Sequence, residues 1–270
     1  MTLNLLLHTP TNLILLSLAV SDFFVGLLWL FQMMIIDGCW LLGDLMCILY
    51  FAFDYIITST SVRTMVLISV DRYVAICDPL HYSTKVTPRR IGVCVSLCWI
   101  SSVFYRSVLI TDDLKQPGRY NLCAGQCVVA ITFIDQISNL IVTFFIPITV
   151  IVVLYLRVFV VAVSQARAMR SHIMLVSHQR SVSVTAKKSE MKAAGTLGLV
   201  IVVFLLCMFP YFNIALRDQS TLLSASSAGF TIYLAHFNSC LNPMIYAFFY
   251  PWFRKSFRLI VTLKILKPGS

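Results

Sequence analysis

The sequence predicts an all-α membrane protein whose helices cross the bilayer six times. Of the 270 residues, 59% are hydrophobic and only 12% are charged, whereas a soluble domain is about a quarter charged. A helix needs roughly 20 apolar residues to cross a bilayer. Six stretches meet this requirement and together predict one membrane domain over residues 1–270: about 12–35, 45–77, 91–110, 132–163, 193–214 and 226–249.

The charged residues between these stretches predict the orientation. Basic residues are concentrated in 78–90, in 164–192 and in the tail 250–270, and short loops rich in Lys and Arg stay cytoplasmic. The alternating connections contain aspartates and few bases, so we expect them outside, and six crossings then place both termini in the cytosol. The net charge of +10 accordingly indicates contact with anionic lipid rather than with nucleic acid.

The segment 251–263, after the last apolar stretch, has an amphipathic pattern. Apolar residues fall at 253, 257, 260 and 261, and the basic residues fall mainly on the other side. This pattern predicts a short helix that lies on the inner leaflet. Pro251 is expected to end the spanning helix before it.

Ionisable residues inside the apolar stretches are the first functional candidates, because charge in a bilayer is costly. Asp54 and Arg72 lie on one stretch, 18 residues apart. This spacing is five full helical turns, so both side chains share a face at a separation of about 27 Å. One helix therefore carries an acidic group near the outer side and a basic group at the cytoplasmic edge, which suits signalling across a membrane.

A second group of polar residues is expected at one depth of the bilayer. It comprises Asp22, Ser61, Asn238, Ser239 and Asn242. Their oxygen atoms suit a hard cation such as sodium, and ordered water or a plain hydrogen-bond network is the alternative. Apart from this sodium ion no cofactor is expected, since the nine cysteines form no zinc pattern.

Several short motifs, in this order along the chain, resemble those of rhodopsin-like G-protein-coupled receptors. They are Asp22 in LAVSD, Asp71-Arg72-Tyr73, Trp99, Pro147 with Tyr155, Phe204-x-x-Cys207-x-x-Pro210 and Asn242-Pro243-x-x-Tyr246. The segment Asn238 to Phe253 is similar at each fixed position to the fingerprint of trace-amine-associated receptors. So are LHTPTN at 7–12, SVDRYVAICDPLHY at 69–82 and CAGQC at 123–127. The resemblance covers nearly the whole chain.

The resemblance implies a fold and a function. The fold is a seven-helix bundle that here lacks its first helix, of which only Met1 to Leu7 remain. The function is a multi-pass receptor of the plasma membrane that senses small protonated amines, in most relatives as odorants. A heterotrimeric G protein of the stimulatory type would then raise cAMP.

The resemblance and the chemistry of the residues together predict the ligand site. Asp54 takes the place where such receptors hold the ammonium group of the ligand, which supplies the counter-charge that a buried carboxylate needs. His236 replaces a Tyr next to Asp54, and Asn139 replaces an aspartate that binds a second amine in some relatives. The remaining expected ligand residues are Phe51, Tyr55, Thr143, Met208, Tyr211, Phe212 and Tyr233.

The resemblance also implies a disulfide and a switch. Cys47 would be bridged to Cys127, which holds an outer loop over the site. Arg72 would be locked to Glu190 in the resting state and released to the G protein when the Pro210 helix moves outward. The other expected switch residues are Asp71, Tyr73, Tyr155, Phe204, Pro243 and Tyr246.

Four alternative interpretations stand against this one: a transporter or channel, an enzyme, a biogenic-amine receptor and a truncated relative. A transporter or channel predicts repeated hydropathy halves or charged pore rings, which the sequence lacks. An enzyme is disfavoured because no catalytic motif is found. Within receptors, the alternatives are a biogenic-amine receptor of the serotonin or dopamine type and a truncated, non-functional relative.

Overall fold

A computed structural model describes residues 9–36, 40–114, 127, 133–173, 195–196, 198–210, 225–249, 258 and 262. Within these residues all regular structure is helical. The helices are α2 (Pro10–Ile36), α3 (Gly43–Cys77), α4 (Tyr82–Lys85), α5 (Pro88–Leu114), α6 (Phe133–Leu140), the π-helix η1 (Ile141–Phe145), α7 (Ile146–Ile173) and α9 (Ala225–Phe249). A further apolar helix covers Gly198–Pro210.

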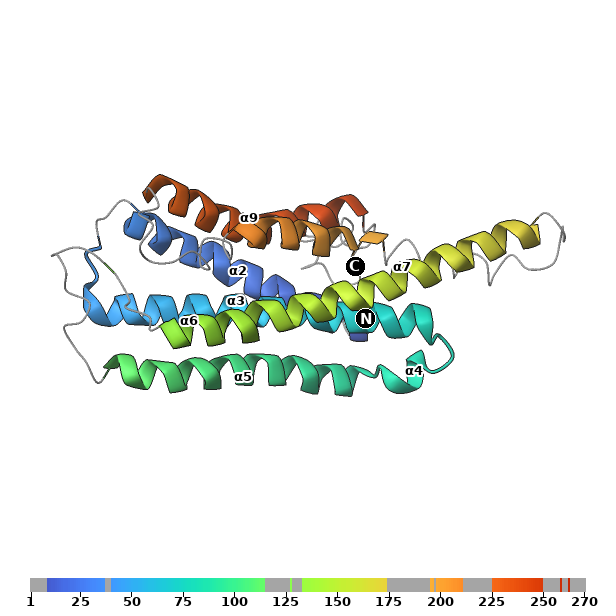
Figure 1. The fold of residues 1–270 in the computed structure, drawn as a ribbon, viewed down its shortest axis with the longest axis horizontal. Coiled ribbons are helices and arrows are strands. Elements are labelled where there is room, and N and C mark those ends of the chain that lie inside the picture. The colour runs from blue at the N-terminus through green and yellow to red at the C-terminus, as the bar shows by residue number, and fades with distance from the viewer. Residues whose placement is uncertain are drawn as a thin grey trace.

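The long helices lie side by side in an elongated bundle (Figure 1). Helix α3 has a central position, because it packs against α2, α5 and α7, while α2 also packs against α5 and α9. Helix α7 continues beyond the ends of its neighbours in Figure 1, in keeping with the expectation that this stretch extends past the membrane. The residues proposed to bind ligand and to signal are therefore arranged around α3.

The helix bounds lie close to those of the predicted spans. Four helices in the described residues are long and apolar enough to cross a membrane: Pro10–Ile35, Gly43–Cys77, Pro88–Leu109 and Ile137–Gln165. Most of the tail predicted to form a surface helix lies outside the described residues. Of its two described residues, Thr262 donates its backbone N–H to the carbonyl of Arg258 at 3.0 Å. The expected absence of a first helix has no test in this structure.

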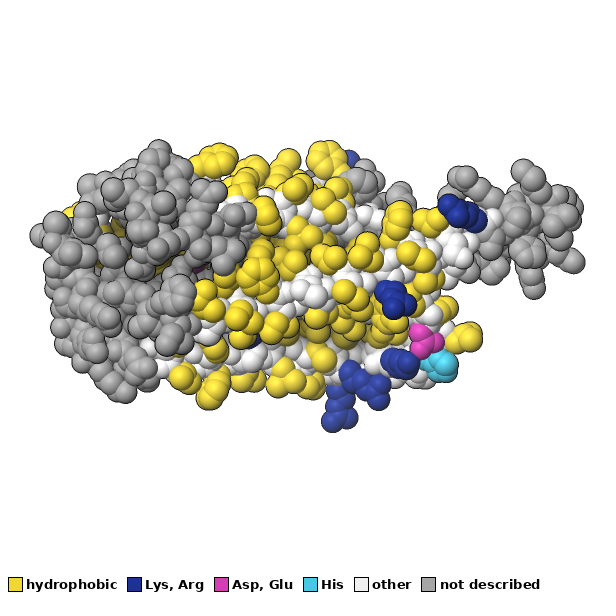
Figure 2. Space-filling view, in the orientation of Figure 1, with side chains coloured by type: hydrophobic (Ala, Val, Ile, Leu, Met, Phe, Trp, Pro, Cys, Tyr) yellow, Lys and Arg dark blue, Asp and Glu magenta, His cyan; other side chains and the backbone are white. Residues whose placement is uncertain are grey.

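The distribution of side chains is the reverse of that in a soluble protein. Large hydrophobic side chains such as Phe23, Phe104 and Phe159 are exposed on the outside of the bundle, while charged and amide groups such as Asp22, Asp71 and Asn242 are buried. Figure 2 shows the exposed apolar side chains along the helical part of the molecule. Such a surface is stable when lipid rather than water surrounds it.

One large apolar cluster fills the interior. It joins α2, α3, α7, α9 and the helix Gly198–Pro210 through residues such as Leu18, Met65, Ile151, Phe204 and Ile245. Polar contacts supplement this core between α2 and its neighbours. Trp99 Nε1 donates to Ser17 Oγ at 3.1 Å, and that hydroxyl lies 3.4 Å from Thr64 Oγ1.

Two prolines and one glycine explain local irregularities of the helices. Pro147 has no N–H to donate to the preceding turn, and the wide turn η1 ends two residues before it, at Phe145. Pro243 lies inside α9 and removes one backbone bond from that helix. Gly43 begins α3 with φ of 78°, a left-handed conformation that glycine adopts without steric cost.

Candidate functional site

The carboxylate of Asp54 and the imidazole of His236 face each other across the bundle. Asp54 lies on α3 and His236 lies 182 residues later on α9, and Oδ1 of Asp54 is 3.3 Å from Nε2 of His236. The Asp54 side chain is 25% exposed and the His236 side chain is 12% exposed. The two groups therefore form an internal site that is not fully closed.

A chain of hydrogen bonds links α3 to the segment that contains the π-helix. The Tyr55 hydroxyl lies 3.0 Å from the Thr143 hydroxyl, which donates to Asn139 Oδ1 at 2.8 Å. Thr143 belongs to η1, and π-helical turns often occur at functional sites. The structure thus brings Tyr55, Asn139 and Thr143 together, and Tyr55 directly follows Asp54 on α3.

Two residues behind Tyr55 were not expected from the sequence. The Tyr105 ring is stacked on the Tyr55 ring with centroids 5.7 Å apart, and the guanidinium carbon of Arg106 lies 6.0 Å from the same centroid. A buried arginine against an aromatic ring gains cation–π attraction. The signal available in the sequence was the charge of Arg106 near the end of an apolar stretch.

The remaining predicted ligand residues occupy different places. Phe51 packs beside the outer disulfide cluster, and Met208 belongs to the buried core. The Tyr233 hydroxyl donates to Met33 Sδ at 3.0 Å, and its ring lies edge-on to Trp29. Tyr211 and Phe212 lie outside the described residues.

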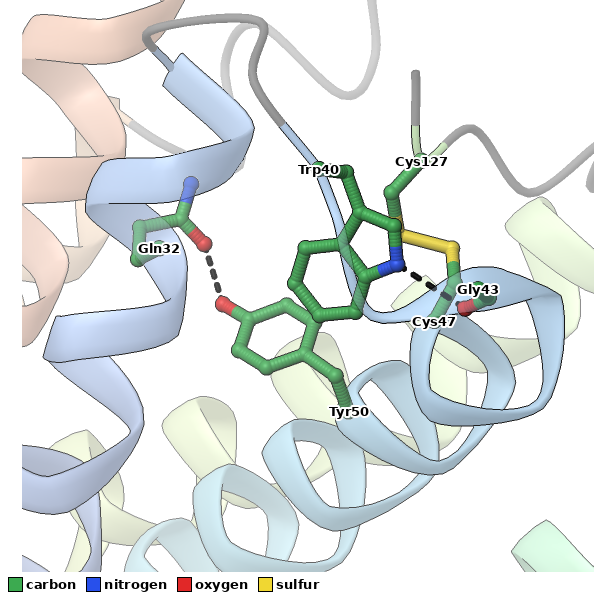
Figure 3. Close-up of a disulfide and its surroundings, with 6 residues drawn as sticks. All are labelled: Gln32, Trp40, Gly43, Cys47, Tyr50 and Cys127. Atoms are coloured by element: carbon green, nitrogen blue, oxygen red, sulfur yellow. Dashed lines mark hydrogen bonds between the residues drawn. A yellow bond between two sulfur atoms is a disulfide. The ribbon is translucent and has the colours of Figure 1, made fainter. Parts of the chain in front are cut away.

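A disulfide joins Cys47 at the start of α3 to Cys127, as predicted (Figure 3). Trp40 and Tyr50 pack against it. Trp40 Nε1 donates to the Gly43 carbonyl at 2.9 Å, and the Tyr50 hydroxyl donates to the side-chain carbonyl of Gln32 on α2. The sequence analysis missed Trp40, Tyr50 and Gln32, although two aromatic residues within seven positions of Cys47 were a usable signal. This cluster anchors the outer ends of α2 and α3.

The predicted polar cluster in the middle of the bundle is centred on Asp22 and Asn242. The Asn242 amide nitrogen donates to both carboxylate oxygens of Asp22, at 3.3 and 3.1 Å. Asn238, Ser239 and Ser61 are also buried. The side-chain oxygens of Asn238 and Asn242 are buried acceptors without a hydrogen-bond donor among the described residues, and buried acceptors normally have one.

Asp71 and Arg72 form a closed network at the inner end of α3. Arg72 donates from Nε to Asp71 Oδ2 at 3.0 Å and also from Nη2. Thr11 on α2 accepts from Arg72 Nη2 at 2.9 Å and donates to Asp71 at 3.0 Å. The Tyr82 hydroxyl donates to Asp71 Oδ1 at 2.8 Å, and burial raises the pKa of Tyr82. Glu190, the expected partner of Arg72, lies outside the described residues.

Thr11 and Tyr82 were not singled out from the sequence as members of this network. Both lie in segments that carried the family resemblance, at 7–12 and 69–82. The signal was therefore present, but spacing alone does not show that either side chain reaches Asp71. The contacts depend on how α2 and α4 lie against α3.

The other predicted switch residues surround the inner half of the bundle. Tyr73 packs with Ile76 and Val158, and Phe204 is buried in the core. Tyr155 packs against that core. Pro210 is the last described residue of its helix, and Pro243 is exposed on α9. The Tyr246 side chain lies outside what the structure describes.

The short helix α4 is held to the end of α3 by charge. Lys85 Nζ and His81 Nδ1 each lie 2.7 Å from a carboxylate oxygen of Asp78. The Lys85 ammonium, followed by the His81 ring, lowers the pKa of Asp78 from 3.8 to about 2. The connection that carries Tyr82 is therefore tied to α3 at neutral pH.

Arg63 has no role in the predicted site, and the structure shows what it contacts. Arg63 Nη1 donates to the Ser101 and Ser102 hydroxyls at 2.7 and 2.8 Å and to the Cys98 carbonyl at 3.4 Å. Ser102 also accepts from Thr60 at 3.0 Å. This cluster joins α3 to α5 on the side of α3 away from Asp54 and Arg72.

Comparison with known proteins agrees with these features. The profile described as "7 transmembrane receptor (rhodopsin family)" matches residues 1–246. The chain is 37% identical to trace amine-associated receptor 13c of Danio rerio, over 98% of this chain and 80% of that protein. It is 38% identical to receptor 8b of Rattus norvegicus over the same shares, and 35% identical to receptor 4 of Mus musculus over 98% and 79%. The chain therefore belongs to the trace amine-associated receptors of the rhodopsin family of seven-transmembrane proteins, and it is a membrane receptor rather than an enzyme.

Proposed function

We propose that this receptor binds small protonated amines through Asp54 and responds by activating a stimulatory G protein at the plasma membrane. The observation that carries the proposal is the partly exposed carboxylate of Asp54 inside the helix bundle. An ammonium group placed there gains a charge-assisted hydrogen bond. The printed names of the relatives, which refer to trace amines, support the same ligand class, and the role in olfaction is part of the proposal.

The neighbours of Asp54 support a ligand with an apolar body and a single charge. Tyr55 and Phe51 supply aromatic surface on α3, and Tyr233 supplies it on α9. The polar end of the site is formed by Asn139 and Thr143, which are neutral. A monoamine that carries a neutral polar group or none fits this chemistry better than a diamine, because the contacts described for these side chains include no second carboxylate.

The signal is proposed to reach the cytoplasm through α3. Asp54 and Arg72 lie 18 residues apart on this one helix, about 27 Å along its axis. An amine that binds the active arrangement more tightly than the resting one shifts the population towards it. The resting arrangement is the network in which Thr11 and Asp71 hold Arg72, and Glu190 is proposed to add to it.

The cluster around Asp22 is proposed to hold a sodium ion. The buried side-chain oxygens of Asn238 and Asn242, which have no hydrogen-bond donor within the described part of the chain, fit this ion, because sodium prefers oxygen ligands. Asp22 would supply the charge, and the Ser61 and Ser239 hydroxyls complete the proposed set. A bound cation would neutralise the buried carboxylate. The test is the unfolding temperature in sodium compared with choline salts, which is expected to rise with sodium in the wild type and not in Asp22→Asn.

The test of the ligand is a cAMP assay in cells. The panel comprises pentylamine, 2-phenylethylamine, N,N-dimethylpentylamine, 1,5-diaminopentane, serotonin and dopamine. Because the matched relatives are longer than this chain, the 270-residue chain is assayed both as it stands and with an N-terminal helix from the Danio rerio relative. Surface staining shows which versions reach the plasma membrane.

The expected result is a response to a monoamine that Asp54→Ala abolishes while surface staining is unchanged. Asp44→Ala serves as the matched control, because Asp44 is an exposed aspartate in the first turn of the same helix. A response limited to serotonin or dopamine would favour the biogenic-amine alternative. An amine response that survives Asp54→Ala would refute the proposed site.

A further inference from the structure

Arg63 carries a positive charge near the middle of the bilayer. It lies nine residues before Arg72 on α3, about 14 Å along the helix from the cytoplasmic edge at which Arg72 is expected. Ser101, which it contacts on α5, lies eight residues, or about 12 Å, before Leu109 at the outer end of the α5 span. Since the hydrocarbon core is about 30 Å thick, both helices place the guanidinium deep inside it.

The guanidinium of Arg63 has hydrogen-bond acceptors but no counter-charge in the described part of the chain. Its Nη1 donates to the hydroxyls of Ser101 and Ser102 and to the Cys98 carbonyl, and these three acceptors are neutral. Every ion pair between described residues involves another cation. A charge inside a bilayer is costly and is normally paired, so Arg63 calls for an acidic partner.

The remaining donors of this guanidinium can be reached from outside the bundle. Arg63 is half-buried and Ser101 is exposed. Nε and Nη2 of Arg63 donate to none of the described residues, and neither is among the buried polar atoms that lack a partner. An arginine presents its donors as a planar fork that matches a carboxylate. A carboxylate that arrives from the lipid side can therefore bind while the serines stay in place.

The surface of α5 around Ser101 has the pattern of a helix-packing seam. Val93, Leu97, Ser101 and Phe104 are exposed, and their spacing of four, four and three residues places them on one face of the helix. We call these four residues the α5 seam. A small residue such as Ser101 within an apolar face lets a second helix approach closely, and Arg63 lies at the same level. An apolar face alone would indicate contact with lipid, whereas the cation at this level indicates a partner.

A helix of another protein fits this surface better than a lipid headgroup or a second copy of the chain. The phosphate of a phospholipid stays at the interface, about 15 Å from the centre of the hydrocarbon core. The described carboxylates at membrane depth are those of Asp22, Asp54 and Asp71. Two of them are buried and Asp54 lies inside the bundle, so a second copy presents none of these three to Arg63. An aspartate or glutamate on a separate helix can reach it.

We infer that Arg63 and the α5 seam form a docking surface for a transmembrane helix of another protein that carries an aspartate or glutamate near the middle of its span. The carboxylate accepts from Nε and Nη2 of Arg63, while apolar side chains of the two helices pack along the seam. An arginine keeps its charge at every physiological pH, so the contact requires no protonation event on the receptor. The inference goes beyond the proposed function, because it concerns the outer surface of the bundle and does not require an amine at Asp54.

The test measures the binding of a model helix to the complete 270-residue chain in vesicles of phosphatidylcholine, which has no net charge. The probe is a peptide of about 20 leucine and alanine residues with lysines at both ends and one glutamate at its centre. Two matched peptides carry glutamine or leucine there. Energy transfer between labelled receptor and labelled peptide is followed as the peptide-to-lipid ratio rises. We expect half-saturation by the glutamate peptide at a ratio about tenfold lower than by the glutamine peptide, because a charge-assisted hydrogen bond is roughly twice as strong as a neutral one.

Variants of the receptor assign this preference to its cation. Arg63→Met should abolish the difference between the glutamate and glutamine peptides, and Arg63→Lys, which keeps the charge, should retain part of it. Phe104→Ala should weaken the binding of both peptides alike, because it removes packing from the α5 seam. Ser107→Ala is the matched control, because Ser107 is an exposed serine of the same helix outside the seam, and it should behave as the wild type.

Equal binding of the glutamate and glutamine peptides to the wild type would overturn the inference, and this comparison needs no variant to fold. A preference for glutamate that persists in Arg63→Met would also overturn it. Energy transfer between two receptor copies that Arg63→Met abolishes would assign the surface to a second copy of the chain. Displacement of the glutamate peptide by an equal amount of oleic acid would assign the cation to a fatty acid dissolved in the membrane. Either of these last two results would overturn the proposed partner.

Discussion

Arg63 allows a prediction in which removing the charge leaves the stability nearly unchanged, whereas removing its hydrogen-bond partners lowers it. Its Nη1 atom donates to Ser101, Ser102 and the Cys98 carbonyl on α5. The perturbations are Arg63→Met, the double change Ser101→Ala with Ser102→Ala, and the combination of all three. The double change leaves the cation in the bundle without its two hydroxyl acceptors, whereas Arg63→Met removes the cation itself.

The hydrogen bonds of Arg63 give the expected change in the free energy of unfolding. A hydrogen bond to a charged group contributes about 1.5 to 3 kcal/mol in soluble proteins, and one between membrane helices contributes about 0.6 to 1.7 kcal/mol. The loss of two acceptors at 2.7 and 2.8 Å should therefore cost about 2 to 4 kcal/mol. Arg63→Met should stay within about 1 kcal/mol of the wild type, because Arg63 is half-buried and replacing a charge inside a protein by an apolar side chain of similar volume is often neutral.

The assay is the unfolding temperature of the receptor in detergent. A change of 1 kcal/mol shifts this temperature by about 2 to 4 °C in a protein of about 150 to 250 residues, so the double serine variant should unfold about 4 to 16 °C below the wild type. Ser107→Ala is the matched control, because Ser107 is an exposed serine of α5 that donates to its own helix. It should be close to the wild type.

The triple variant decides between a specific contact and general damage to α5. If the loss arises from an unpaired Arg63, Arg63→Met should restore most of the stability of the double serine variant. A double variant as stable as the wild type would refute the reasoning. So would an Arg63→Met variant that loses as much as the serine pair, because Arg63 would then contribute net stability.

Three further predictions concern the two ends of α3. Cys47→Ser removes the disulfide between residues 80 positions apart, whose stabilisation of the folded state has an upper bound of about 4.5 kcal/mol from chain entropy. The unfolding temperature should therefore fall and no longer respond to dithiothreitol. An unchanged temperature would contradict this. Thr11→Val removes contacts of Arg72 that stabilise the resting network by about 1 to 2 kcal/mol, so ligand-free cAMP should rise several-fold at equal surface expression, and unchanged cAMP would count against that network. Lys85, followed by His81, holds the pKa of Asp78 at about 2 instead of 3.8, so the stabilisation of the fold by ionised Asp78 is complete above about pH 4 and is lost as the pH falls towards 2. The unfolding temperatures of wild type and Asp78→Asn should therefore differ at pH 7 and converge near pH 2. A difference that stays constant with pH would contradict this role of Asp78.

Much of the fold could be predicted because a bilayer limits the choice of structures. Every backbone polar group must be satisfied inside the lipid, so long apolar stretches become helices, and their bounds follow the hydropathy within a few residues. The π-helical turn η1 was not predicted. Pro147 marks its place in the sequence, but whether a proline produces a kink, a wide turn or a break depends on the packing around it.

In the candidate site, too, some features could be predicted from the sequence and others depended on packing. Asp54, Arg72 and Asp22 could each be recognised as functional candidates from the sequence, because an ionisable group in a membrane segment is costly and usually has a function. Their partners could not all be recognised. Thr11 and Tyr82 are ordinary polar residues until α2 and α4 bring them to Asp71.

The sequence by itself therefore determined the helical membrane fold, the family, the disulfide between Cys47 and Cys127 and the acidic residue to which a ligand is proposed to bind. These features depend on composition, on helical period and on motifs, which are properties of short stretches. Only the tertiary structure decided that Arg63 meets two serines of α5 and that His236 meets Asp54. Such contacts depend on the rotation and the depth of each helix relative to its neighbours, and these are set by the packing of the whole bundle.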